Sequence, residues 1–194
     1  MTLKLAQQGE LSAEGTQHRR RFLQLGFGAA ASLAMPSAFA NVIASPERKL
    51  SLLNLHTGED INATYWAEGQ YQTSELHAIN RVLRDHRTGD VMNMDSDLIE
   101  LLNILHHKMD GKQAFHVISG YRSPKTNAML NKKSSGVAKK SLHMQGRAID
   151  IRLPGRQLAS LQQAAMSLHA GGVGYYSRSD FIHIDTGRVR SWGS

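Results

Sequence analysis

The 194-residue chain contains no cysteine, and this absence limits what can hold its fold together. Disulfides, iron–sulfur clusters and thiolate zinc sites are excluded, so any metal site must use His, Asp or Glu. Hydrophobic residues make up 41% of the chain and charged residues 20%, which is enough apolar material for one domain of this length. The composition therefore predicts a globular protein with an apolar core rather than a disordered chain.

The first forty residues have the pattern of an export signal. Residues 19–24, RRRFLQ, fit a twin-arginine motif, and a moderately apolar stretch follows over residues 25–35. Residues 38–40, AFA, have the small residues of a cleavage site. The apolar stretch is far shorter than the roughly 20 residues of a membrane span, so we expect no stable membrane insertion. We predict that the twin-arginine machinery exports the protein, that residues 1–40 are cleaved, and that residues 41–194 reach the periplasm.

The net charge is positive, with 23 Lys and Arg against 16 Asp and Glu. The predicted signal removes four basic and two acidic residues, which leaves a charge of 7 − 2 = +5 on residues 41–194. Outside the cytoplasm such a protein meets little nucleic acid, and the carboxylate-rich polymer of the cell wall is the anionic partner that we expect. Lys139 and Lys140 either attract an acidic peptide stem or form an ordinary solvated surface.

Hydrophobic periodicity predicts a single α+β domain over residues 41–194. Alternating or short apolar segments favour strands at residues 50–56, 61–67, 114–120, 147–153, 173–176 and 181–185. Helical spacing of apolar residues favours helices at residues 73–86, 95–109, 123–130 and 156–169. Early strands, then helices, then strands joined mostly by hairpins indicate an antiparallel sheet with helices packed on it.

Three residues that can bind a metal lie on or beside two of these strands. His143 stands seven residues before Asp150, and His183 lies in the strand 181–185. Asp150 is flanked by Ile149 and Ile151 and so points to the face opposite both; if buried it needs a partner such as a metal. Two imidazoles and a carboxylate match a catalytic zinc site, whose fourth ligand is a water with a pKa lowered to about 7. Taken alone, His183 also fits a core histidine bonded to a neighbour.

Three segments resemble a known family: SGYRS (119–123), HMQGRAID (143–150) and FIHIDTG (181–187). They are similar to the zinc D-alanyl-D-alanine carboxypeptidase-like (LAS-type) peptidases, and over residues 50–192 the chain is most similar to the murein endopeptidases among them. The resemblance implies a Hedgehog/D,D-peptidase-like fold, in which helices flank a small antiparallel sheet and one zinc per chain lies in a cleft. It also implies that His143, Asp150 and His183 are the zinc ligands.

The general base is left open between two carboxylates. In many members of the wider family an acidic residue lies three positions before the last histidine, and Asp180 holds that position here. Other members use a histidine two positions before it, which Phe181 excludes. Asp185 shares a strand face with His183, so it fits either the base or a partner that orients an imidazole. For Asp180 a turn-forming role fits equally well.

Arg122 follows a buried strand, and the resemblance places it in the cleft. There its guanidinium would bind a substrate carboxylate or stabilise the oxyanion of the tetrahedral intermediate, whereas the alternative is a surface salt bridge. Candidates for hydrogen bonds to the substrate are Ser119, Tyr121 and Ser123.

Together these features predict a zinc-dependent murein endopeptidase that hydrolyses peptide cross-links of peptidoglycan, with links between two diaminopimelate residues as the favoured target. Zinc would polarise the scissile carbonyl, and a carboxylate would carry the proton. One alternative is a D,D-carboxypeptidase that trims stem peptides. The other is a non-catalytic peptidoglycan-binding module, although three ligands with a nearby acid favour catalysis over a structural site, which usually has four protein ligands.

Overall fold

The computed structural model describes residues 45–134 and 136–193. The predicted signal peptide therefore lies outside the described residues, and its cleavage, the export route and the domain boundary at residue 41 stay predictions. No helix within the described ranges is long and apolar enough to cross a membrane.

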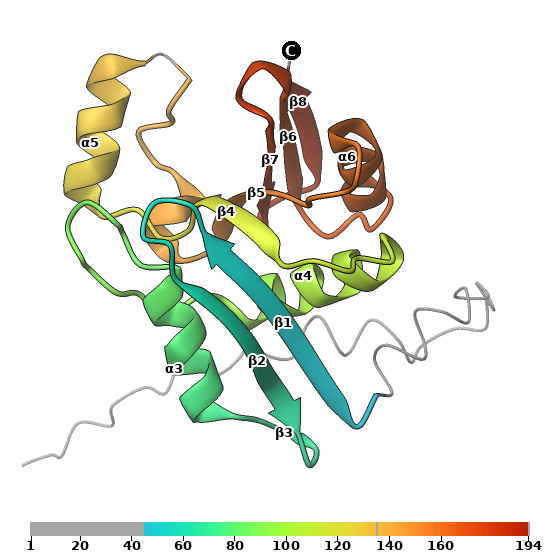
Figure 1. Ribbon diagram of the computed structural model, residues 1–194. Helices are drawn as coiled ribbons and strands as arrows, with labels where there is room; N and C mark the ends of the chain where they lie inside the picture. Colours follow the sequence, from blue (N-terminus) through green and yellow to red (C-terminus); the bar gives the residue numbers. More distant parts are fainter. Residues whose placement is uncertain (1–44, 135, 194) are drawn as a thin grey trace, which may run out of the picture. The chain divides into compact units, whose positions relative to one another are not determined.

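Eight strands form one sheet, in the order β3-β2-β1-β4-β5-β7-β6-β8 (Figure 1). They are β1 (Glu47–Asn54), β2 (Asp60–Ala67), β3 (Gln70–Tyr71), β4 (Phe115–Ser119), β5 (Ala148–Arg152), β6 (Gly172–Tyr176), β7 (Phe181–Asp185) and β8 (Arg190–Gly193). The α+β class is confirmed, but the prediction of a small antiparallel sheet is wrong, because the sheet has eight strands and because β1 runs parallel to β4 and β6 parallel to β8. The β1–β4 pair is parallel because two helices cross over between β3 and β4, whereas hairpins would keep neighbours antiparallel.

Four α-helices occur in the described part of the chain: α3 (Thr73–Val82), α4 (Ser96–Lys108), α5 (Pro124–Lys133) and α6 (Leu158–Met166). Local chemistry sets where two of them begin. Asp95 caps α4 by accepting a hydrogen bond from the backbone N–H of Asp97. Ser123 caps α5 in the same way, and Pro124 occupies the first helical position, where its missing N–H costs nothing.

Helices α3, α4 and α6 pack on one face of the sheet and form the apolar core with it. Side chains from alternate positions of the central strands enter this core, among them Leu52, Val117, Ile149, Ile151, Ile182 and Ile184. The intervening residues of β5 and β7 point to the opposite face. Asp150, His183 and Asp185 therefore share the face that these helices do not cover.

Candidate metal centre

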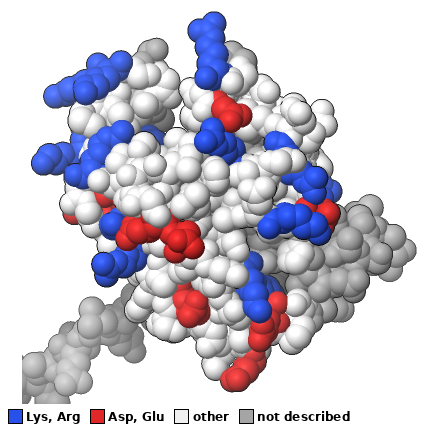
Figure 2. All heavy atoms as spheres, in the orientation of Figure 1, with Lys and Arg blue, Asp and Glu red and all other residues white. Residues whose placement is uncertain are grey.

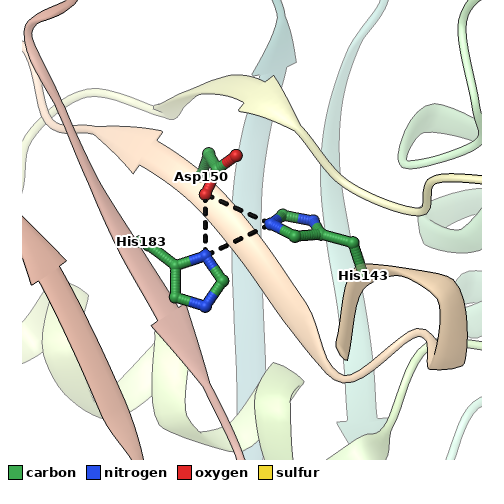
Figure 3. Close-up of side chains that lie close together, drawn as sticks. All are labelled: His143, Asp150 and His183. Carbon is green, nitrogen blue, oxygen red and sulfur yellow. Dashed lines mark hydrogen bonds and ion pairs between the residues drawn. The ribbon is translucent and has the colours of Figure 1, made fainter. Parts of the chain in front are cut away.

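Asp150 and His183 lie opposite each other on neighbouring strands. They are directly paired in the antiparallel ladder between β5 and β7, and the isoleucines on either side of each point into the core. His143 approaches from the short 3₁₀ helix η2 (Leu142–Gln145), and Figure 3 shows the three side chains converging. The structure thus brings together the three metal ligands predicted from the sequence.

The turn that carries His143 is shaped by its two ends. Ser141 caps η2 by accepting a hydrogen bond from the backbone N–H of His143. Gly146 ends it with a φ of 67°, and a Cβ there would stand 2.6 Å from the carbonyl oxygen of Asn93. Glycine is therefore required both for the left-handed conformation and for the close approach, and the chain can turn at once into β5.

The three candidate ligand atoms form a nearly equilateral triangle. His143 Nε2 lies 3.2 Å from Asp150 Oδ1, His183 Nδ1 lies 2.9 Å from the same oxygen, and the two nitrogens are 3.2 Å apart. A tetrahedral zinc with bonds of about 2.0–2.1 Å separates its ligand atoms by roughly 3.3–3.4 Å. The triangle is therefore close to the size that such an ion requires, and it is the only His, Cys, Asp or Glu cluster of this kind among the described residues.

The tautomers of the two imidazoles follow from the hydrogen bonds of their outer nitrogens, which are the ring nitrogens outside the triangle of candidate ligand atoms. His143 Nδ1 is 2.7 Å from the carbonyl oxygen of Gly120, and His183 Nε2 is 2.9 Å from Asp185 Oδ2. Neither oxygen can donate, so these nitrogens carry the protons in the neutral rings. The inner nitrogens then direct two lone pairs at the carboxylate oxygen of Asp150, an arrangement that needs a cation or a shared proton at its centre.

The electrostatics of the cluster also favour positive charge at its centre. Burial by itself would lower the pKa of His183, but its hydrogen bonds to Asp150 and Asp185 raise that pKa to about 9. Burial would raise the pKa of Asp150, yet the charges and hydrogen bonds of His143 and His183 hold it well below its usual range. The donor set and its charge therefore fit a divalent metal ion.

Asp185 is buried completely and holds the outer side of His183. Its Oδ2 accepts from His183 Nε2 at 2.9 Å and from Arg190 Nη2 at 2.6 Å. Its Oδ1 accepts from Arg190 Nη1 at 3.0 Å and from the backbone N–H groups of Gly172 and Gly187. Five donors thus occupy this carboxylate, which fits the orienting role considered from the sequence. Sequence reasoning missed Arg190, because no spacing signal links it to the site.

Asp180 lies beside the cluster rather than in it. It follows the 3₁₀ helix η3 (Ser177–Ser179) in a left-handed conformation, with a φ of 52°. Its Oδ2 accepts from Arg152 Nη1 at 2.9 Å in a neighbouring groove, and its side chain is 62% exposed. The structure therefore shows the turn-forming role, and the role of general base stays a prediction.

A cleft of about 460 Å³ opens over the three candidate ligands. One wall is aromatic: the ring of Tyr176 stacks on Phe181 at 4.6 Å, and Trp192 Nε1 donates to the hydroxyl of Tyr176 at 3.0 Å. The ring of Trp192 also lies 5.2 Å from that of His183. Sequence reasoning missed Trp192, because the four-residue strand that carries it is too short to show a periodic pattern.

Arg122 lines the cleft, as the resemblance implied. Its Nη2 is 3.5 Å from Asp150 Oδ2 and 3.3 Å from the hydroxyl of Ser119, and its Nη1 is 3.4 Å from Asn127 Oδ1. Its side chain is only 11% exposed, so the arginine is not a surface salt bridge. Its guanidinium adds a fixed positive charge next to the candidate ligands.

The other predicted substrate contacts are placed differently. Ser119 accepts a hydrogen bond from Arg122 and does not itself line the cleft. Tyr121 packs in the apolar core, and the hydroxyl of Ser123 is used to cap α5. The structure therefore brings only Arg122 of this group to the cleft wall, because the fold already occupies the other three side chains.

Comparison with known proteins gives a consistent family. The sequence model of the peptidoglycan L,D-endopeptidase MepK family of M15 peptidases matches residues 42–192. The peptidoglycan L,D-endopeptidase MepK of Escherichia coli K12 is 42% identical over 176 residues, which are 90% of this chain and 97% of that protein. The probable peptidoglycan L,D-endopeptidase MepK of Haemophilus influenzae is 38% identical over 178 residues, 91% of this chain and 96% of the relative.

Proposed function

The chain belongs to the MepK family of M15 peptidases, and on this premise we propose that it is a zinc-dependent endopeptidase that hydrolyses the peptide cross-links of peptidoglycan. The predicted resemblance to the murein endopeptidases of this family is confirmed. M15 peptidases are metallopeptidases, and the homologues support peptidoglycan endopeptidase activity. The observation that carries the proposal for zinc is the triangle of His143 Nε2, Asp150 Oδ1 and His183 Nδ1.

Zinc held by these three residues would act as a Lewis acid toward the scissile carbonyl and lower the pKa of a bound water. The chain's own residues supply the remaining requirements. Asp185 and Gly120 fix the two imidazole rings with their lone pairs turned inward. Arg122 is positioned to bind a substrate carboxylate or the oxyanion that forms at the attacked carbonyl. The rings of Tyr176, Phe181 and Trp192 offer an apolar wall to the peptide.

We propose Asp180 as the proton acceptor and Asp185 as a positioning residue. The five donors around Asp185 leave its oxygens no capacity to take a proton from the substrate side. Asp180 is adjacent in the chain to Phe181, which lines the cleft, and its carboxylate forms an exposed ion pair with Arg152. Breaking such a pair costs about 0–1 kcal/mol, so the carboxylate can rotate toward the cleft when substrate binds.

For the bond that is cut, we propose the link between two diaminopimelate residues. The relatives are named L,D-endopeptidases, and that link joins an L centre to a D centre. A link that ends on D-alanine joins two D centres and fits the name less well. A D,D-carboxypeptidase and a binding module without catalysis are the alternatives that the experiment must separate.

The test uses purified residues 41–194 and defined cross-linked muropeptide dimers, with products identified by mass spectrometry. We expect chelator-sensitive conversion of the diaminopimelate-linked dimer to two monomers, and full recovery on adding one equivalent of zinc. His143→Ala should bind no zinc and release no monomer. Loss of a single alanine from the dimer would indicate the carboxypeptidase instead, and binding without any product would indicate the binding module.

We further propose that residues 1–40 direct twin-arginine export to the periplasm. The support is the RRRFLQ motif at residues 19–24 with its short apolar stretch. Replacing Arg19 and Arg20 by lysine should leave the full-length precursor in the cytoplasm, as fractionation and immunoblotting would show. Undiminished appearance of the shortened protein in the periplasm would rule out this route.

A further inference from the structure

One edge of the domain carries an unusual excess of positive charge. Residues 111–149 contain eight Lys and Arg and no Asp or Glu, although acidic residues occur on both sides of this segment. Five of the eight lie on α5 or in the loop that joins it to η2. We call them the basic edge: Lys125, Lys132, Lys133, Lys139 and Lys140.

The basic edge faces solvent without acidic partners. All five lysines are exposed, and none of them forms an ion pair with Asp or Glu within residues 45–134 and 136–193. Thr126 and Asn127 are the buried side of α5, so Lys125 and Lys132 share its outer side, two turns or about 10 Å apart. Figure 2 shows Lys and Arg side chains gathered over the part of this face that α5 occupies in Figure 1.

The basic edge is continuous with the rim of the cleft. Gly136, Val137, Ala138 and Lys140 from the loop all line the cleft. Two asparagines one helical turn apart on α5 hold this loop in place. Asn131 donates to the carbonyl of Val137, and Asn127 donates to the carbonyls of Ala138 and Lys139. A polymer whose peptide enters the cleft at this rim would therefore pass directly over the lysines.

We propose that the basic edge binds carboxylate groups of peptidoglycan stems that are not being cut, and so docks the insoluble polymer beside the cleft. This inference rests on the proposed function. A cleft of about 460 Å³ accommodates the peptide around one bond but not the neighbouring stems, which must lie on the surface outside it. Exposed ammonium groups bind carboxylates weakly one at a time, but several together add up when the ligand repeats along a chain.

The test compares two triple variants with the same change in charge. The edge variant carries Lys125→Gln, Lys132→Gln and Lys133→Gln, none of which lines the cleft. The control variant carries Lys49→Gln, Arg81→Gln and Lys112→Gln, which lie on β1, on α3 and between α4 and β4, outside the basic edge. Glutamine keeps a helix propensity similar to that of lysine, and thermal unfolding would verify that both variants fold.

Binding to purified sacculi is measured by sedimentation with chelator present, so that the readout is independent of hydrolysis. At low ionic strength we expect the edge variant to bind about tenfold more weakly than wild type and the control variant to stay within twofold. The difference should vanish at high salt, because screening shortens the range of these interactions to a few ångströms. With zinc restored, kcat/KM on a soluble dimer should stay within twofold for both variants, while sacculus digestion by the edge variant slows.

Two results would overturn the inference. The first is equal weakening of both variants, which would mean that only net charge matters. The second is an edge variant that binds sacculi as wild type does but no longer binds vesicles containing phosphatidylglycerol. This result would mean that the basic edge binds an anionic lipid surface. A wild-type protein that binds sacculi through the edge but cuts no dimer would refute the proposed function and leave the docking surface in place.

Discussion

Replacing Asp185 by asparagine tests whether this carboxylate orients His183 in the candidate metal centre. The change keeps the shape of the side chain but removes a negative charge from a fully buried position. One amide oxygen can still accept from His183 Nε2, and the amide NH₂ then faces Arg190 and two backbone N–H groups, which are all donors. Breaking a buried ion pair costs about 3–5 kcal/mol, and partial exposure of Arg190 reduces this to roughly 2–4 kcal/mol.

For a domain of this size, that loss lowers Tm by about 5–15 °C. Zinc affinity should fall about 10–100-fold, because a neutral amide oxygen is a weaker acceptor for His183 Nε2 than a carboxylate and fixes the tautomer and orientation of the ring less firmly. Thermal unfolding of the metal-free protein measures the first effect, and competition with a chromophoric chelator measures the second. Asp110→Asn is the control: among the described residues this exposed carboxylate pairs with Lys112 and Arg156 at the surface, so the Tm of this variant should change by about 1 °C or less.

The reasoning would be refuted by one particular combination of results. If Asp185→Asn kept its zinc affinity within threefold and its Tm within 2 °C but lost 100-fold or more in kcat, the carboxylate would be a proton carrier and not a support.

Three further predictions concern Asp180, Asn127 and His86. Asp180→Asn should lower kcat about 100-fold or more with zinc affinity unchanged, as single-turnover kinetics would show; activity within threefold of wild type would exclude it as the base. Asn127→Ala removes the acceptor of Arg122 Nη1 and the donor to two loop carbonyls, while Arg122 Nη2 keeps Ser119 and Asp150, so stability should fall by about 1–3 kcal/mol and KM should rise more than kcat falls in steady-state assays. His86 stacks on His56 at 3.8 Å, and burial and the positive charge of that neighbour lower the pKa of His86 to about 4. In the unfolded chain the imidazole of His86 binds a proton near pH 6.5, whereas in the folded protein it does so only near pH 4. The free energy of unfolding therefore falls as the pH is lowered from about 6.5 to 4. Urea unfolding of His86→Phe should show a smaller decrease over the same pH range.

Local sequence patterns predicted six of the described strands, the four α-helices and the candidate ligands. Alternation placed Asp150 on the face opposite Ile149 and Ile151, and the structure has it there, paired with His183 across β5 and β7. Strand alternation depends on residues close together in the chain, which is why spacing alone predicts it.

The tertiary structure decided which residues surround those ligands. The parallel neighbours of β1 and β6 depend on how distant segments cross over, and β3 and β8 are too short to show a period. Asp180 and Asp185 are the same residue type at similar distances from His183 in the chain, yet one meets Arg152 in a neighbouring groove and the other meets five donors. The sequence by itself determined what each side chain can do chemically and which way its strand turns it. Which donors and acceptors it meets depends on segments brought together by folding, and those partners are the basis for proposing Asp180 as the proton acceptor and Asp185 as the positioning residue.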